Sequence, residues 1–251
     1  MKAIEIEAWI NQVLTPENYR DYGPNGLQLA NSARPITKLA LAVSASLEAI
    51  EKAAQAQADA ILVHHGIFWD GQRQTIQGPQ YHKIQRLIEA DMALFAYHLP
   101  LDNHPLLGNN AQLALKLGLK DQRQILSEGG QFSGVMAQAG GITPQELQEK
   151  AKQLLNRQPL LLEFGTQDIQ QVAIVTGGGQ KYFEQALAEG ADAFITGESS
   201  EFNYGQAQEH RANFLACGHY ATERFGVQAL GEQLSRETGI EHQFIDCENP
   251  I

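Results

Sequence analysis

The sequence predicts an α/β protein made of two pseudo-repeated lobes with largely parallel sheets. Short buried strands alternate with amphipathic helices, a pattern typical of βαβ units. When residues 39–66 are shifted by 133 positions they fall on 172–199 without a gap, and Ala58-Asp59-Ala60 then meets Ala191-Asp192-Ala193. Two unrelated βαβ units would share small and apolar residues, but an ungapped match over 28 positions favours duplication. We expect lobes of about 1–126 and 127–251.

Hydrophobic periodicity places the elements of the first lobe. An amphipathic helix is expected over 3–14, and Asn25-Gly26 marks a turn. The helix after Asn109 should end at Gly118, a C′ glycine. The other expected elements are a strand at 39–43, a helix at 47–57, a strand at 60–63, a helix at 82–90 and a strand at 93–97.

The second lobe should repeat this order after a distinct middle segment at about 125–170. Strands are expected there at 132–137 and 160–164. Between them, Thr143-Pro144-Gln145-Glu146 has an N-cap threonine, a proline at the first helical position and a glutamate at N3, which form a capping box. Further on, 213–216 resembles the strand at 93–96.

Composition excludes several classes of function. The 251 residues are 43% hydrophobic and 19% charged, which is ordinary for a globular protein. A net charge of −11 argues against a dominant nucleic-acid or anionic-membrane surface. The apolar runs are too short to span a bilayer, and residues 1–10 lack the apolar region of an export signal. We therefore expect a cytoplasmic protein in which Cys217 and Cys247 are reduced thiols.

Five side chains suited to metal binding follow predicted strands, and ligands of α/β proteins gather beyond the carboxyl ends of strands. Imidazole and carboxylate together suit zinc, iron, manganese or nickel. Five such groups exceed what one open catalytic ion takes from protein, so the pattern indicates two metal ions. The candidate ligands are His64, His65, Asp102, His219 and Glu223.

Each candidate has an ordinary reading when it is taken alone. His64 and His65 could be polar residues that end a strand, and Asp102 could cap a helix. Glu223 could be a solvated carboxylate, but it lies four residues after His219, so the two share one face if a helix begins there. Their matching positions after three strands favour a metal site.

Further polar residues lie near the same strand ends. His98 could hold a ligand in place or contact substrate, or be a hydrogen-bonded histidine at a strand end. Glu198 could be an acid or base near the metals, or cap the next helix. His104 could line the same cleft. The run 177–179 could bind an anion, but it lacks the P-loop lysine, so we favour a tight turn.

Spaced motifs resemble one family, the GTP cyclohydrolase I type-two homologues, also called NIF-three-like, and in particular its YbgI-type bacterial members. The amino-terminal motif Asn25-Gly26-Leu27-Gln28 extends the likeness over almost the whole chain. The other matching segments are 64–69, 97–102, 176–179, 196–198 and 218–223.

The resemblance implies intertwined α/β lobes, a dinuclear metal site and a toroidal homohexamer. By motif it makes His64, His65, Asp102, His219 and Glu223 the ligands, with Glu223 as the bridge. Longer relatives carry an inserted middle domain, and the short connection here predicts none. The family name implies action on GTP, which we treat as a label.

Two functions follow as hypotheses. The first is a metal-dependent hydrolase that acts through a metal-activated water on a small-molecule nucleotide, phosphoester or cyclic amide. The rival is a non-catalytic metal-binding scaffold, with a regulatory or metal-handling role. An open coordination position would favour the enzyme, and ions enclosed by protein ligands would favour the scaffold.

Overall fold

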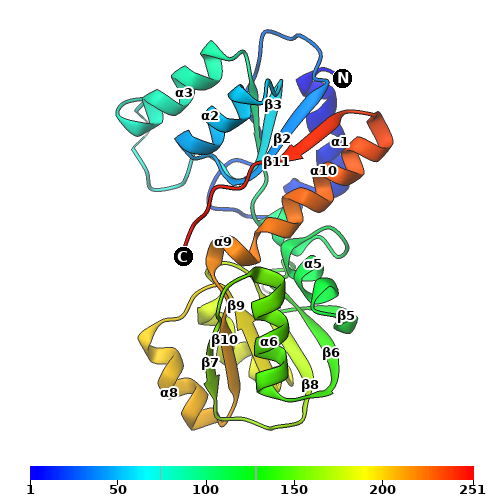
Figure 1. Ribbon diagram of the computed structural model, residues 1–251, viewed down its shortest axis with the longest axis vertical. Coiled ribbons are helices and arrows are strands. Elements are labelled where there is room, and N and C mark those ends of the chain that lie inside the picture. The colour runs from blue at the N-terminus through cyan, green and yellow to red at the C-terminus, as the bar shows by residue number, and fades with distance from the viewer. Residues whose placement is uncertain (74, 128) are drawn as a thin grey trace. The chain divides into compact units, whose positions relative to one another are not determined.

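The computed structural model describes residues 1–73, 75–127 and 129–251, which form two compact units (Figure 1). Unit 1 comprises Met1–Leu101 and Gly226–Glu248, and unit 2 comprises Asp102–Phe225 and Asn249–Ile251. The units are interleaved in sequence, so the expected boundary near residue 126 coincides with none of the breaks between them. No helix in the described ranges is long and apolar enough to cross a membrane.

Unit 1 is built on a five-stranded sheet in the order β1-β4-β3-β2-β11. All its strand pairs are parallel except β1 with β4. Its strands are β1 (Gly26–Leu29), β2 (Lys38–Ser44), β3 (Ala60–His65), β4 (Ala93–Ala96) and β11 (Glu241–Phe244). Its helices are α1 (Ala3–Leu14), η1 (Pro16–Asn18), α2 (Leu47–Gln55), α3 (Pro79–Glu89) and most of α10 (Arg224–Thr238), while α4 (Leu99–Asn103) spans the boundary.

Helices cover both faces of this sheet because its central strands are apolar on both sides. Ala40 and Ala42 of β2 pack in one cluster with Ile50 of α2 and Leu87 of α3. The alternate residue Leu41 faces α10, where a Cβ on Gly231 would lie 2.4 Å from the Leu41 Cδ1 atom. Only glycine therefore lets α10 approach the sheet so closely.

Unit 2 has a six-stranded mixed sheet in the order β5-β6-β8-β9-β10-β7. Its central strands β8, β9 and β10 are parallel, whereas β5, β6 and β7 pair antiparallel. The strands are β5 (Lys120–Ile125), β6 (Gly134–Ile142), β7 (Leu160–Glu163), β8 (Ile169–Val175), β9 (Ala193–Thr196) and β10 (Asn213–Ala216). The helices are α5 (Asn109–Lys116), α6 (Pro144–Leu155), η2 (Gln180–Tyr182), α7 (Phe183–Ala188), α8 (Glu201–His210) and α9 (His219–Thr222).

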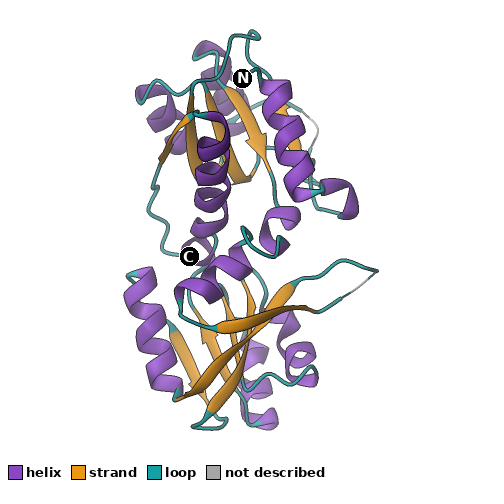
Figure 2. Ribbon diagram, turned by 90° about the vertical axis from the view of Figure 1, so that its right-hand side faces the viewer, coloured by secondary structure: helices purple, strands orange, loops and turns teal. Residues whose placement is uncertain are grey.

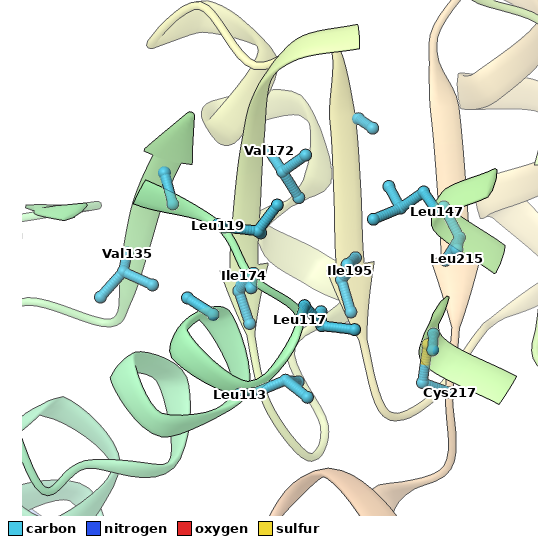
Figure 3. Close-up of a cluster of buried hydrophobic side chains, with 14 of the residues drawn as sticks. Leu113, Leu117, Leu119, Val135, Leu147, Val172, Ile174, Ile195, Leu215 and Cys217 are labelled. Atoms are coloured by element: carbon cyan, nitrogen blue, oxygen red, sulfur yellow. The ribbon is translucent and has the colours of Figure 1, made fainter. Parts of the chain in front are cut away.

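Helices flank both faces of the unit 2 sheet as well (Figure 2). On one face, Ile174 and Ile195 pack with Leu113 of α5 and Leu147 of α6 (Figure 3). Burial of each such side chain contributes about 1.5–3 kcal/mol. On the other face three phenylalanine rings pack with centroids 5.1–5.8 Å apart, namely Phe183, Phe194 and Phe214.

The strand registers confirm the pseudo-repeat. In unit 1, Leu39 pairs with Ala60, and in unit 2 Val172 pairs with Ala193, the same register after the shift of 133. The next pairs also correspond, because β3 is parallel to β4 and β9 is parallel to β10. The antiparallel neighbours β1 and β7 occupy matching edges. The order 1-4-3-2 in one sheet thus corresponds to 7-10-9-8 in the other.

One aspartate in each repeat has the same structural task. Asp59 accepts hydrogen bonds from the backbone N–H groups of Thr37 and Lys38, at 2.8 and 3.0 Å. Asp192 accepts them from Gln170 and Gln171, at 2.9 and 2.8 Å. Each carboxylate therefore ties the start of one central strand to the start of the next, which explains the shared Ala-Asp-Ala sequence.

The local predictions are largely confirmed. The helix over 3–14 has the expected ends, and Thr143 with Glu146 forms the capping box, with backbone-to-side-chain distances of 2.8 and 3.2 Å. Helix α3 begins at Pro79, three residues before the expected start, because the proline occupies its first turn. Strand β6 begins at Gly134 and runs to Ile142, further than expected.

Candidate metal centre

Three imidazoles converge at the carboxyl end of the unit 1 sheet. His64 and His65 are the last residues of β3, and their ring centroids lie 4.5 Å apart, tilted by 44°. His98 follows β4, and its ring centroid lies 5.0 Å from that of His64 and 5.6 Å from that of His65. One ring nitrogen from each of the three histidines can be chosen so that all three nitrogens lie within 4.8 Å of one another. Adjacent strand residues would normally face opposite sides, so the turn at the strand end brings these rings together.

Each of these rings is held at its Nδ1 atom. The His64 Nδ1 lies 3.0 Å from the carbonyl oxygen of Tyr97, and the His65 Nδ1 lies 3.0 Å from the Ser44 hydroxyl. The His98 Nδ1 lies 2.7 Å from a carboxylate oxygen of Asp21. The Tyr97 carbonyl and the Asp21 carboxylate can only accept, which favours the tautomer of His64 and His98 with its proton on Nδ1 and leaves the Nε2 lone pair for a metal.

Asp21 is a buried carboxylate that the sequence argument missed. Its side chain is 3% exposed, and it accepts hydrogen bonds from the backbone N–H groups of Tyr22 and Leu99 as well as from His98. Burial acts to raise the pKa of Asp21, but the hydrogen bond and charge of His98 outweigh it and hold that pKa below its usual range. Asp21 therefore stays ionised and fixes the His98 ring. Its closeness to the Asn25-Gly26-Leu27-Gln28 motif was the available signal.

The amino-terminal motif supports the histidine loop. Asn25 accepts a hydrogen bond from the backbone N–H of His98 at 2.8 Å, and Gln28 accepts one from Ile67 at 2.9 Å. A Cβ on Gly66 would lie 2.4 Å from the Gln28 amide, so a glycine is required directly after the histidine pair.

Unit 2 places its own candidate ligands around the short helix α9. His219 is the first residue of α9, and Glu223 follows its last. The His219 Nε2 atom lies 3.1 Å from Glu223 Oε2, and its Nδ1 lies 2.6 Å from Glu198 Oε1. Burial acts to lower the pKa of His219, but hydrogen bonds and charges of the two glutamates outweigh it and raise that pKa to about 9. This concentration of negative charge suits a cation.

Asp102 is held in the same unit by two polar neighbours, Asn109 and Thr176. Its Oδ1 atom accepts a hydrogen bond from the Asn109 amide at 2.9 Å and one from the Thr176 hydroxyl at 3.4 Å. The Asn110 amide oxygen in turn accepts from the Thr176 N–H at 2.8 Å. One carboxylate oxygen of Asp102 lies within 4.8 Å of one of Glu223. The two carboxylates and His219 thus form a mixed oxygen and nitrogen donor set.

The glycine run 177–179 after β8 packs closely against Glu223 and His219. Gly177 has φ +63°, and a Cβ there would lie 1.9 Å from Glu223 Oε1 and 3.1 Å from His219 Nε2. The N–H groups of Gly177 and Gly179 donate to the hydroxyls of Thr222 and Thr196, each at 3.1 Å. Since these donors are engaged within the protein, the preference for a tight turn over an anion-binding loop agrees with the structure.

Comparison with known proteins identifies the family of this chain. The model of the Duf34/NIF3 (NGG1p interacting factor 3) family matches residues 1–250. The chain belongs to the Duf34/NIF3 family. Proteins named GTP cyclohydrolase 1 type 2 homolog from Haemophilus influenzae and Vibrio cholerae are 43% and 42% identical over 100% of both chains. The solved structure of protein ybgI, titled as of unknown function, is 39% identical with a TM-score of 0.94 over 100% of both chains.

His104 and Cys217 have structural roles in this Duf34/NIF3 chain. The His104 Nδ1 accepts hydrogen bonds from the N–H groups of Leu106 and Leu107, at 3.2 and 2.9 Å, so it closes a turn. Cys217 is fully buried, and burial raises the pKa of its thiol to about 12. A thiol with such a pKa is no nucleophile at neutral pH.

The residues present in this Duf34/NIF3 chain fit a transition metal. Unit 1 offers imidazole nitrogens, and unit 2 offers one imidazole with two carboxylates. All four imidazoles have Nδ1 engaged within their own unit, as metal-binding histidines usually do. Such donors suit zinc, iron, manganese or nickel.

Proposed function

We propose that the chain binds two divalent transition-metal ions and hydrolyses a small-molecule substrate with their help. The observation that carries the proposal is the uniform engagement of Nδ1 in four histidines, which prepares each Nε2 as a ligand or base. In this proposal the two ions form one dinuclear centre. Its ligands are His64, His65, Asp102, His219 and Glu223.

Two bound ions would lower the pKa of a water molecule and polarise the substrate. The chain itself fixes the ligands in advance. Glu223 is 3% exposed, it contacts His219 at 3.1 Å and it lies against Gly177. A carboxylate held on these sides cannot change its direction, which supports the bridging role for Glu223.

His98 and Glu198 are the expected acid–base groups, and their surroundings differ. His98 pairs with the buried Asp21, so its Nε2 can accept and return a proton while Asp21 stabilises the charged ring. Glu198 Oε1 is engaged by His219 at 2.6 Å. This contact supports a positioning role for Glu198, in which it holds the proton on Nδ1 of His219.

The alternative is a metal-binding scaffold without catalysis. The observation in its favour is the low exposure of His64, Asp102 and Glu223, at 0%, 9% and 3%. Ligands this buried would enclose their ions, and an enclosed ion has no open position for substrate.

A substrate screen separates the two functions. Metal-loaded and chelator-treated protein should be compared on nucleotides, phosphoesters and cyclic amides. We expect hydrolysis by the loaded form alone, restored by manganese, zinc, nickel or iron. If the loaded form hydrolyses none of these substrates, the scaffold becomes the better account.

We further propose a homohexamer in the cytoplasm. The assembly follows from the family resemblance, and the reduced state of Cys217 and Cys247, which form no disulfide, agrees with a reducing compartment. Light scattering should give six times the chain mass of 27.6 kDa. A stable monomer at micromolar concentration would contradict the assembly.

A further inference from the structure

We infer that Arg157 forms an oxyanion subsite beside the His219 loop and takes a phosphoryl group of the substrate. The inference rests on the proposed function, because it assigns a substrate class to the same site.

The topology of unit 2 brings Arg157 to the ligand-bearing edge of its sheet. Helix α6 ends at Leu155, and its C-cap residue Asn156, with φ +52°, turns the chain toward β7. Strand β7 pairs antiparallel with β10, and Leu160 lies opposite Ala216. The turn that carries Arg157 therefore lies beside the carboxyl end of β10, from which the His219 loop emerges.

The guanidinium lies directly on Gly218. A Cβ at Gly218 would lie 2.1 Å from Nη1, 2.6 Å from Cζ and 2.9 Å from Nε of Arg157. Gly218 also has φ +96°, where side chains are strained. Any side chain at this position would displace the guanidinium, so the glycine before His219 keeps the space for it.

The charge of Arg157 is not balanced within the described part of the chain. Two other arginines have carboxylate partners: Arg34 pairs with Asp59 and Asp91, and Arg123 pairs with Glu189. Among the described residues, none forms an ion pair with the half-buried Arg157 or accepts a hydrogen bond from it. The neighbouring titratable group is the buried, neutral thiol of Cys217.

A phosphoryl group matches this guanidinium in charge and shape. The planar fork of N–H donors binds two phosphate oxygens side by side. Of the substrate classes considered, a nucleotide or phosphoester carries this group, and a neutral cyclic amide does not. Arg157 would thus orient the substrate by its phosphate next to His219.

The test is titration calorimetry of the full-length protein with inorganic phosphate, as purified and after treatment with a chelator. Arg157→Gln should weaken phosphate binding by about tenfold or more in both preparations, because a charge-assisted pair is lost. Arg157→Lys keeps the charge without the fork and should bind with intermediate affinity. Arg211→Gln is the matched control, because Arg211 is exposed just before the opposite end of β10, and should leave binding unchanged.

A second measurement needs no variant. Phosphate should protect Arg157, and not Arg211, from modification by phenylglyoxal, as read by mass spectrometry. Unchanged phosphate affinity in Arg157→Gln, or no protection of Arg157, overturns the inference. Stronger protection by acetate than by phosphate overturns the choice of a phosphoryl group. Metal content is measured separately and reports on the metal centre. If Arg157→Gln weakens phosphate binding in a protein that holds no metal, only the proposed function is contradicted.

Discussion

Gly177 offers a way to disturb the proposed metal centre without removing a ligand. In Gly177→Ala the new Cβ would lie 1.9 Å from Glu223 Oε1, so the carboxylate must retreat by about 1.1 Å to reach even a 3.0 Å contact. Metal–ligand distances tolerate only about 0.2 Å. The His219 Nε2 atom, 3.1 Å from the same Cβ, is also crowded. We therefore expect metal affinity to fall by at least about tenfold.

The adjacent glycine provides the control. A Cβ on Gly178 would come no closer than 3.8 Å to its neighbours, and Gly178 lacks the positive φ of Gly177. Gly178→Ala should keep its metal. Alanine at the φ of Gly177 adds a backbone cost of about 1 kcal/mol, which leaves a folded protein.

The assay is metal analysis by mass spectrometry on both variants after purification without chelators, with melting temperatures to confirm folding. Full metal content in a folded Gly177→Ala protein would refute the reasoning, because Glu223 could then move by 1.1 Å without consequence for the ions.

Three further predictions concern carboxylates and His98. Burial acts to raise the pKa of Asp59, but hydrogen bonds from the start of β2 outweigh burial and lower that pKa. The ionised Asp59 therefore stabilises the fold fully above the usual aspartate pKa, and this stabilisation is lost as pH falls through the lowered value. Asp59→Asn should lower the free energy of unfolding, measured with denaturant, by about 2–3 kcal/mol and weaken its dependence on acid pH. Asp192→Asn should also lower the free energy of unfolding. An unchanged free energy of unfolding in either variant would contradict the shared role of the two aspartates. Glu198→Gln should weaken metal binding by about 10–100-fold if it positions His219, whereas unchanged binding with a lower rate would restore it as an acid or base. His98→Ala should keep the metal and lose rate, and loss of metal would make His98 a ligand.

The sequence was sufficient where periodicity and strand ends carry the information. The sequence repeat predicted β2, β3, β8 and β9, because buried parallel strands need continuous apolar residues. The pairing register is the same in the two repeats. The histidine pair and the motif around His219 were found because the pair ends one such strand and the motif lies shortly after another. Beyond the strand ends, the chemical types of the side chains were enough to suggest a metal.

Other features depend on tertiary contacts that no local pattern reveals. Strand β5 is mostly polar and exposed, and it forms only because it pairs with β6. Asp21 meets His98 across 77 positions of sequence, and Arg157 meets Gly218 across 61. The return of α10 and β11 to the first sheet was not predicted, because it depends on β11 pairing with β2.

The central claim is that the chain binds two transition-metal ions and that Glu223 is a ligand of both. The most direct measurement is the number of transition-metal ions per chain in the wild-type protein and in Glu223→Ala. The control is His82→Ala, a change on the exposed face of α3. The account predicts close to two ions per chain in the wild type and in His82→Ala, and reduced occupancy of both ions in Glu223→Ala. A wild-type protein without metal, or full occupancy in Glu223→Ala, would contradict it.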